Sequence, residues 1–314
     1  MARYLITGGT GLIGSSLIES LRETPAKFFV LTRDPSAALS KLGPTINYIS
    51  NLDQLNPDTP IDFVVNLAGE PIADKPWSTK QKLKLWQSRV ELTNQLITWI
   101  AKQKTPPKAL ISGSAIGWYG DGEDKILDEH SQPHQEYTHN LCDAWEKAAL
   151  KAVASGVRVC IIRTGLVLSS EGGFLKKLIL PFKLALGATL GSGNQYMSWI
   201  HIDDQVNAIR FLLGIDSPLE NAEPEPTNTI NQRTGIFNLV APSPVTNYEF
   251  TQQFASAVNR PAFIRVPQRL LSLGLGEMSR LLTTGQRVIP KHLQSLGFQF
   301  KFESLASALE DVLE

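Results

Sequence analysis

The sequence has few residues of the kinds that build disulfide scaffolds, metal clusters or membrane spans. Only two of its 314 residues are cysteines, and each lies in an amphipathic or apolar run, so we expect Cys142 and Cys160 to be reduced core residues. No apolar run approaches the length of about 18 residues that spans a bilayer. The chain begins directly with the strand-like residues 3–7 and shows no features of a secretory signal peptide, which predicts a soluble, cytoplasmic protein.

The sequence also lacks an excess of charge of either sign. Lys and Arg together number 30, as do Asp and Glu, so the formal net charge is zero. Such a balance provides no overall field that would attract nucleic acid or an anionic membrane. We therefore expect a small-molecule substrate as the partner, with neither nucleic-acid binding nor membrane insertion. Apolar residues make up 42% and charged residues 19%, an ordinary composition for a globular chain with a sizeable core.

Apolar runs typical of buried parallel strands alternate with helix-period segments in the first half of the chain. The expected strands are 4–7, 28–32, 63–67, 109–112 and 157–163, and the expected helices are 12–22, 79–104 and 141–154. This order predicts an α/β fold, a Rossmann-type doubly wound parallel sheet built from right-handed βαβ units.

The pattern changes after about residue 165. Helices are predicted at 174–186, 247–259, 267–282 and 305–313, and the acidic, proline-rich stretch 218–228 predicts an exposed loop. We therefore divide the chain into an NAD(P)-binding Rossmann domain, 1–165, with segments around 195–240 returning to it, and a smaller, mainly helical substrate region, 166–314. The tail of that region, 246–314, either closes the cleft or forms the face of a homodimer.

A glycine-rich loop connects the first strand to the first helix, with the sequence Gly8-Gly9-Thr10-Gly11-Leu12-Ile13-Gly14. In this context the first glycine gives the tight turn, the second lets the backbone approach a pyrophosphate, and the third lets the helix pack on the strand. The helix N-terminus then presents free N–H groups to the phosphates. The loop thus predicts a dinucleotide site rather than a plain turn. The predicted contacts are Thr7, Gly8, Gly11, Leu12, Ile13 and Gly14.

The end of the second strand decides which dinucleotide is expected. It reads Leu31-Thr32-Arg33-Asp34. Arg33 would offer a bidentate guanidinium to a 2′-phosphate and Thr32 would add a hydroxyl, which favours NADP(H) over NAD(H). The alternative is that Arg33 is a solvated loop residue and that Asp34 binds the ribose of NAD.

Four segments together resemble the extended short-chain dehydrogenase/reductase superfamily. They are the glycine loop, VNLAG at 65–69, SGSAIGWYGD at 112–121 and WIHIDD at 199–204. The resemblance is closest to the atypical NAD(P)-dependent epimerase family, often labelled nucleoside-diphosphate-sugar epimerase, and segments 181–204, 241–250 and 285–290 extend it over essentially the whole chain. It implies an oxidoreductase or epimerase activity with a nucleotide cofactor.

The resemblance also implies cofactor contacts outside the glycine loop. The end of the third predicted strand would line the adenosine and pyrophosphate side, whereas Ser112 and the segment 165–167 would approach the nicotinamide. Arg89, on a long helix, would be a further contact, although an exposed helical arginine would have the same spacing. The implied contacts are Leu67, Ala68, Gly69, Arg89, Ser112, Gly165, Leu166 and Val167.

The superfamily acts through a serine or threonine and a tyrosine followed four residues later by a lysine, whose ammonium lowers the phenol pKa. This sequence departs from that pattern. Tyr137 is followed by Leu141, and an alignment on Glu146 instead places Thr138 and Cys142 in the two positions. Neither alignment yields the pair, and the sequence shows no cation that would lower the pKa of Tyr137.

Two residues of the 112–121 segment remain candidates for catalysis. Ser114 would orient the substrate, unless it is a capping serine. Tyr119 would donate a proton, unless it forms an aromatic wall with Trp118. His201 and Asp203 supply too few ligands for a metal, so we assign none and expect Asp203 to cap the helix that follows.

Three functions are compatible with these residues. The first is an NADP(H)-binding oxidoreductase or epimerase-like enzyme with its chemistry in the cleft. The second is a non-catalytic NADP(H)-binding regulator or scaffold, which the missing tyrosine–lysine pair favours. The third is a nucleotide-sugar epimerase with Arg163, Arg265 and Arg287 as phosphate partners, although ion pairs explain these arginines equally well.

Overall fold

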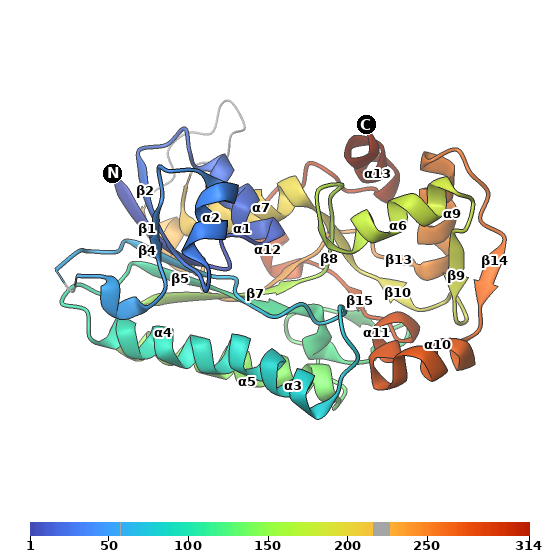
Figure 1. Cartoon of the computed structure of the whole chain (residues 1–314), viewed down its shortest axis with the longest axis horizontal. Helices are drawn as coiled ribbons and strands as arrows, with labels where there is room; N and C mark the ends of the chain where they lie inside the picture. Colours follow the sequence, from blue (N-terminus) through green and yellow to red (C-terminus); the bar gives the residue numbers. More distant parts are fainter. Residues whose placement is uncertain (57, 216–226) are drawn as a thin grey trace.

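The structure, a computed structural model, describes residues 1–56, 58–215 and 227–314 (Figure 1). The predicted exposed loop 218–228 lies outside the described residues except for its last two positions. A sheet flanked by helices occupies one half of the molecule, and a smaller region built mainly from the last third of the chain occupies the other. No helix in the described part of the chain has the length and apolar character needed to cross a membrane.

Seven parallel strands form the central sheet, in the order β12-β7-β5-β4-β1-β2-β3. The strands are β1 Ala2–Thr7, β2 Ala26–Leu31, β3 Asn47–Ile49, β4 Phe63–Asn66, β5 Ala109–Ala115, β7 Arg158–Thr164 and β12 Gly235–Leu239. The order reverses between β1 and β4, and the crevice outside such a reversal is where open α/β sheets bind ligands. The predicted fold class and all five predicted strands are confirmed, whereas β3 and β12 were not predicted.

Helices cover both faces of the sheet. Successive residues of a strand point to opposite faces, and both sets are apolar here, so each face needs a cover. Tyr4 and Ile6 of β1 pack in the core on the α1 and α7 side, whereas Leu5 packs on the α4 and α5 side. The helices on these faces are α1 Leu12–Ser20, α2 Pro35–Leu42, α3 Thr79–Trp86, α4 Leu92–Ala101, α5 Tyr137–Leu150, α7 Ile202–Leu213 and α12 Lys291–Ser295. The predicted helix 79–104 consists of α3 and α4 joined by a π-helical turn, Gln87–Glu91.

The smaller region combines helices with two-stranded pairs. Its helices are α6 Gly173–Lys183, α9 Asn247–Ala257, α10 Gln268–Leu275, α11 Arg280–Thr283 and α13 Leu305–Leu313, and α8 Thr227–Gln232 precedes β12. The paired strands are β8 Leu166–Leu168 with β11 Trp199–His201, β9 Ala188–Leu190 with β14 Ile264–Val266, β10 Tyr196–Met197 with β13 Val245–Thr246, and β6 Ile126–Leu127 with β15 Arg287–Val288. The helix predicted at 267–282 is divided, because α10 ends at Gly276 with a positive φ of 57°.

The start of α7 differs from the sequence prediction. His201 caps the helix, since its Nδ1 accepts the backbone N–H of Asp203 at 3.1 Å. The expectation that Asp203 is the cap was therefore wrong, and its carboxylate instead binds the Lys301 ammonium at 2.9 Å. The neighbouring Asp204 accepts the backbone N–H of Lys301 at 2.7 Å, so the C-terminal segment is attached to the first turn of α7.

The two cysteines are buried and free, as predicted. Burial raises the pKa of the Cys160 thiol to about 12, so this side chain is a neutral core residue.

The burial of the His201 ring predicts that the stability of the fold depends on pH. Its ring is buried and lies 3.1 Å from Asp311, with Asp203 and Lys301 also close, and burial lowers its pKa below the ordinary value. The folded protein therefore holds a neutral ring, whereas the unfolded chain binds a proton near pH 6.5. The free energy of unfolding should fall as the pH falls through about 6.5, by at most about 1.4 kcal/mol per pH unit from this one group.

The substitution His201→Asn removes the titrating ring and keeps a capping oxygen. Urea denaturation at pH 7, 6 and 5 should show a steeper acid loss of stability in the wild type than in this variant. Equal slopes for the two proteins would show that His201 is not responsible.

Candidate functional site

The glycine loop crosses the carboxyl edge of the sheet where the strand order reverses. Gly8 has a φ of 70°, and a Cβ added there would lie 2.6 Å from the carbonyl of Leu67. A Cβ added at Gly14 would lie 2.4 Å from the carbonyl oxygen of Gly8. Gly11, at the start of α1, supplies no side-chain cap, so the first-turn N–H groups of this helix are free to bind an anion. The loop therefore fits a dinucleotide pyrophosphate.

A chain of buried hydrogen bonds lies beneath this loop. The Thr7 hydroxyl donates to Asn66 Oδ1 at 2.7 Å, and the Asn66 amide donates to the hydroxyls of Thr93 at 2.8 Å and Ser112 at 3.2 Å. The backbone N–H of Ala68 donates to Thr7 Oγ1 at 3.1 Å. All four side chains in this chain are at most 1% exposed. The hydroxyls of Thr7 and Ser112 thus fix the strand ends, and any cofactor contact of these two residues must come from their backbones.

The residues after β2 bear on whether Arg33 binds the 2′-phosphate of NADP(H) or Asp34 binds the ribose of NAD. The Arg33 side chain is 94% exposed and its guanidinium lies 3.9 Å from Glu70. Asp34 caps α2, its carboxylate accepting a first-turn backbone N–H at 3.0 Å. The Asp34 carboxylate is therefore engaged in the cap, whereas the Arg33 guanidinium has, among the described residues, only the long contact with Glu70 and is open to solvent. Thr32 Oγ1 accepts the Asp34 N–H at 3.3 Å, and so belongs to the same turn.

Lys41 is a second cation at the glycine loop that sequence reasoning missed. It lies in the last turn of α2, and its ammonium donates to the carbonyl oxygen of Thr10 at 2.8 Å. No local motif marks this lysine, because only the packing of α2 brings it to the loop, 31 residues away in sequence.

Arg89 lies in the π-helical turn between α3 and α4, a distortion often found at functional sites. Its Nη2 donates to the carbonyl oxygen of Glu70 at 2.9 Å, and a Cβ added at Gly69 would lie 2.9 Å from its Cζ. Its guanidinium lies 5.4 Å from the centre of the Trp145 ring. The side chain is thus packed against the end of β4 and is not the exposed helical arginine of the alternative interpretation.

The segment 165–167, the second predicted group of cofactor contacts, leads into β8. Gly165 is packed so closely that an added Cβ would lie 2.5 Å from the carbonyl oxygen of Ser198. Leu166 and Val167 are half-buried in β8, which pairs with β11. Past β8, a Cβ added at Gly172 would lie 3.4 Å from Leu12 of the glycine loop. The segment that continues from β8 therefore passes close to Leu12 of the glycine loop.

A buried ion pair lies under the predicted catalytic segment. The Ser114 hydroxyl donates to Glu146 Oε1 at 2.6 Å, and Arg163 donates to both oxygens of Glu146 at 2.9 and 2.8 Å. The Arg163 side chain is 1% exposed and its Cζ lies 3.5 Å from the centre of the Trp118 ring. Arg163 is therefore a core ion-pair residue and not a phosphate partner.

Tyr119 is also part of the core. Its side chain is 1% exposed and its hydroxyl donates to Asn238 Oδ1 at 2.8 Å. Burial raises its pKa to about 12, the opposite of what proton transfer near neutral pH requires. The geometry fits the alternative interpretation, in which Trp118 and Tyr119 form an aromatic wall with ring centres 5.3 Å apart.

The positions expected for tyrosine and lysine hold no such pair. Thr138 is buried, and burial raises the pKa of the Cys142 thiol to about 11, so Cys142 provides no charge. Tyr137 has a cation nearby that the sequence did not reveal, since the Lys82 ammonium lies 4.4 Å from its ring centre. Arg89 also lowers its pKa, but burial outweighs the charge and leaves the pKa of Tyr137 raised.

Three ion pairs connect the smaller region to the Rossmann half. They are Lys177–Asp74 at 2.5 Å, Lys82–Glu277 at 2.6 Å and Arg280–Glu136 at 2.7 Å. All six side chains are partly solvent-exposed, and such pairs contribute little stability individually. They connect α6 to the loop before α3, the turn Gly276–Ser279 to α3, and α11 to the start of α5.

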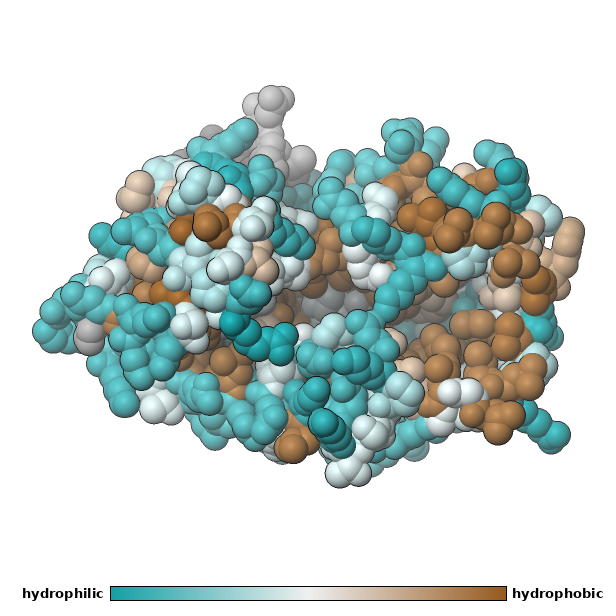
Figure 2. All heavy atoms as spheres, viewed as in Figure 1, coloured by the Kyte–Doolittle hydropathy of each residue, from teal (hydrophilic) through white to brown (hydrophobic). Residues whose placement is uncertain are grey.

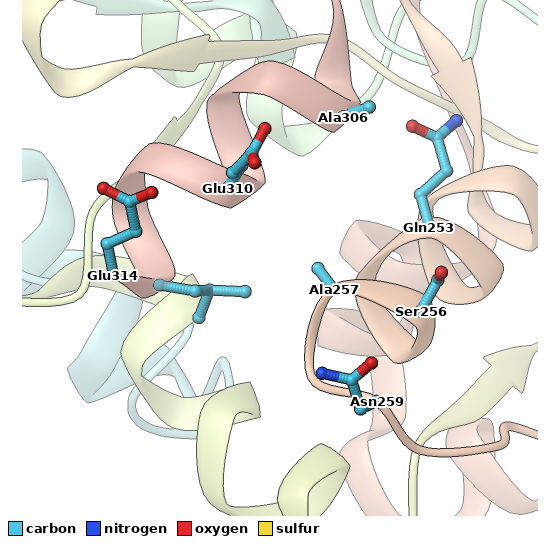
Figure 3. Close-up of a pocket in the computed structure, with 8 residues that line it drawn as sticks. Gln253, Ser256, Ala257, Asn259, Ala306, Glu310 and Glu314 are labelled. Atoms are coloured by element: carbon cyan, nitrogen blue, oxygen red, sulfur yellow. The ribbon is translucent and has the colours of Figure 1, made fainter.

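Two surface hollows lie outside the cofactor loops. A groove of about 430 Å³ separates α9 from α13, and Figure 3 shows Gln253 and Glu310 on its two sides. None of the predicted site residues lines it. A smaller hollow of about 260 Å³ lies between the turn after Tyr119 and α11. Its lining includes the carboxyl groups of Asp121 and Asp124, which would repel a diphosphate.

A group of three side chains with metal-ligand chemistry occurs where α13 meets α7. The ligand atoms of His201, Asp203 and Asp311 lie within 4.8 Å of one another. The ammonium of Lys301 lies 2.9 Å from Asp203 and 3.9 Å from Asp311, so a cation of the chain itself already neutralises these carboxylates. We assign no metal to this group.

Comparisons with known proteins match both halves of the chain. Residues 4–223 match the family described as the NAD dependent epimerase/dehydratase family, and residues 266–312 match a domain of unknown function, DUF1731. An epimerase family protein of Staphylococcus epidermidis is 34% identical over 322 residues, which cover all of both proteins.

Two solved structures extend the likeness to three dimensions. A human epimerase family protein, crystallised with NADPH, is 32% identical with a TM-score of 0.84, and the match covers 99% of this chain and 98% of the human one. A nucleoside-diphosphate sugar epimerase from Corynebacterium glutamicum is 28% identical with a TM-score of 0.74, and the match covers 99% of this chain and 58% of that chain.

The buried ion pair under Ser114 predicts that removing Glu146 destabilises the protein much more than removing Asp143, another acidic residue on α5. Glu146→Ala would leave the guanidinium of Arg163 buried and unpaired, so it should lower the free energy of unfolding by about 3–5 kcal/mol. Asp143 pairs at 2.7 Å with Lys147, whose side chain is 71% exposed, so Asp143→Ala should cost less than about 1 kcal/mol. Chemical denaturation of the two variants measures both values, and similar losses would contradict the interpretation.

Proposed function

The chain belongs to the NAD dependent epimerase/dehydratase family, and from that premise we propose that it binds NADPH and uses it to exchange hydride with a carbonyl substrate in the cleft beside the glycine loop. The observation that carries the proposal is the tight path of the glycine loop at the start of α1, where a Cβ at Gly8 or Gly14 would clash with the backbone of Leu67 or of Gly8. The free N–H groups at the start of α1 complete a pyrophosphate cradle.

The charges beside the loop favour NADPH over NADH. Arg33 is exposed at the end of β2, and Lys41 reaches the Thr10 carbonyl from α2. Asp34, the residue that would select NAD, is engaged in capping α2. Arg33 and Lys41 would both attract a 2′-phosphate, which would compete for the Arg33 guanidinium with the Glu70 carboxylate 3.9 Å away. The human relative crystallised with NADPH supports the same choice.

The bound cofactor would supply hydride, and the residues of this chain would bind the cofactor and orient the substrate. Arg89 would reach the cofactor from the end of β4, where its guanidinium is held by Glu70. Ser114 gives its hydrogen to Glu146 and keeps its oxygen lone pairs, so it would orient a substrate by accepting a hydrogen bond from a substrate hydroxyl and not from the carbonyl oxygen, which has no hydrogen to donate. Proton transfer would not use a tyrosine–lysine pair, because Cys142 is a neutral thiol at the position of the lysine.

That same missing pair favours a second candidate function, a non-catalytic NADP(H)-binding regulator or scaffold. The buried Tyr119 hydroxyl and the neutral Cys142 are both consistent with a site that binds the cofactor without turnover. A nucleotide-sugar epimerase has less support. Arg163 is held in the core by Glu146, and Arg287 lies over the ring of Tyr196 at 4.8 Å.

Cofactor selectivity tests the role assigned to Arg33. Calorimetric titration of nucleotide-free protein should give tighter binding of NADPH than of NADH, and Arg33→Ala should weaken NADPH binding by about 10- to 100-fold, the loss of a charge-assisted hydrogen bond. NADH binding should change little. Lys27→Ala, which removes an exposed cation from the opposite end of β2, serves as the control. Equal binding of both nucleotides, unchanged in Arg33→Ala, would restore NAD as the cofactor.

Isotope transfer tests the proposed chemistry. NADPH deuterated at C4 of the nicotinamide should transfer deuterium to a member of a panel of ketones and aldehydes, detected by mass spectrometry. With such a substrate, Ser114→Ala should lower kcat by about 10- to 100-fold through lost orientation. Tyr119→Phe should leave kcat within about twofold and cost about 1 kcal/mol of stability. Tight NADPH binding without transfer to any compound would favour the non-catalytic function.

A further inference from the structure

Exposed apolar side chains gather on the smaller region. The described residues expose fifteen large apolar side chains, and eight of these lie between positions 180 and 273. Figure 2 shows the corresponding hydrophobic surface at the end of the molecule where Figure 1 places α6, β14 and α10. Its most exposed members are Leu180, Leu184, Leu186, Phe263, Leu270 and Leu273, which we call the apolar face. Patches of this kind mark interaction sites more often than ordinary surface.

The three segments that carry the apolar face are joined to one another. Arg260, three residues before Phe263, donates to the carbonyl oxygen of Lys183 at 3.0 Å, next to Leu184. Strand β14 pairs with β9, which follows Leu186 directly, and α10 follows β14. Helix α10 contains four leucines and has no buried residue, although its sequence is amphipathic. Leu271 and Leu275 are partly buried, whereas Leu270 and Leu273 are 60% and 86% exposed, so one apolar side of α10 is left open for a partner.

The two stretches of sequence that carry the apolar face contain charged residues of one sign. Neither 172–202 nor 250–276 contains an Asp or Glu, although the whole chain has a net charge of zero. These two stretches contain the cations Lys176, Lys177, Lys183, Arg260, Arg265 and Arg269. Only Lys177 among them takes part in an ion pair within the described residues, with Asp74. The next acid along the chain, Glu277, is paired with Lys82.

We propose that the apolar face docks on the surface of an anionic lipid bilayer. Exposed leucines on stretches whose charged residues are all basic match the composition of interfacial membrane segments. The leucines would lie at the boundary of headgroups and acyl chains, and the cations at lipid phosphates. A second copy of the chain fits less well, because a symmetric contact would bring two basic rims together. Docking on a surface needs no membrane-spanning helix, and it does not depend on the proposed hydride transfer.

Vesicle sedimentation tests the proposal on the full chain. The protein should sediment with vesicles of phosphatidylcholine mixed with phosphatidylglycerol, bind phosphatidylcholine alone at least tenfold more weakly, and lose binding at high salt. Each cation at a bilayer surface contributes about fivefold in affinity, so Lys183→Gln/Arg265→Gln/Arg269→Gln should weaken binding by about 100-fold. Leu270→Gln/Leu273→Gln, at side chains 60% and 86% exposed, should weaken it without unfolding the protein.

The matched control is Leu150→Gln/Val153→Gln, which changes two exposed apolar residues outside the apolar face, 39% and 58% exposed, and should leave vesicle binding unchanged. Circular dichroism and NADPH titration of all variants would show that the fold is intact. Absence of vesicle binding, or equal binding by the leucine variant and its control, would overturn the proposal. A wild-type dimer in sedimentation velocity that Leu270→Gln/Leu273→Gln converts to a monomer would assign the face to a second copy instead.

Discussion

The chain of buried hydrogen bonds from Thr7 through Asn66 to Thr93 and Ser112 is the interaction on which the site depends. It joins three neighbouring strands to α4 in the buried interior, where an unpaired hydroxyl or amide would cost about 1–3 kcal/mol. Each member is satisfied by another, so the strand ends have one arrangement. That arrangement places the Leu67 carbonyl against Gly8, and the requirement for glycine in the loop follows from the contact.

A second buried polar unit explains why the region beside the loop differs from an ordinary dehydrogenase site. Glu146 and Arg163 neutralise each other beneath Ser114, with Trp118 covering the guanidinium. Polar side chains at positions that resemble catalytic ones are thus engaged in holding α5 to β5 and β7. No lysine on α5 brings a positive charge to Tyr137, and the charge of Arg89, from the π-helical turn on the neighbouring helix, does not prevent burial from raising the pKa of Tyr137.

The sequence predicts those elements whose structure depends on residues that are neighbours in the chain. Apolar runs located five strands of the sheet, and the glycine spacing located the loop, because both depend on neighbouring residues. Strand β3 has only three residues and gave no signal. The paired carboxylate and guanidinium of Glu146 and Arg163 are 17 residues apart, and Lys41 is 31 residues from Thr10, so only tertiary packing brings each pair together.

The N-terminal caps of α2 and α7 show that sequence prediction is also limited within a single helical turn. Asp34 and Asp203 both precede or begin helices, and composition alone does not say which of them uses its carboxylate as the cap. The structure gives that role to Asp34, whereas His201 caps α7 and leaves Asp203 to Lys301. The distinction bears on the proposed cofactor, because an Asp34 that caps α2 leaves Arg33 as the exposed charged side chain at the end of β2.

A crystal structure of the chain with NADPH tests the central claim most directly, that the glycine loop and its two cations form an NADPH site. The account predicts the pyrophosphate on the first-turn N–H groups of α1 and the 2′-phosphate within hydrogen-bond distance of Arg33, Lys41 or both. A nucleotide bound elsewhere, or a 2′-phosphate in solvent away from both side chains, would contradict it.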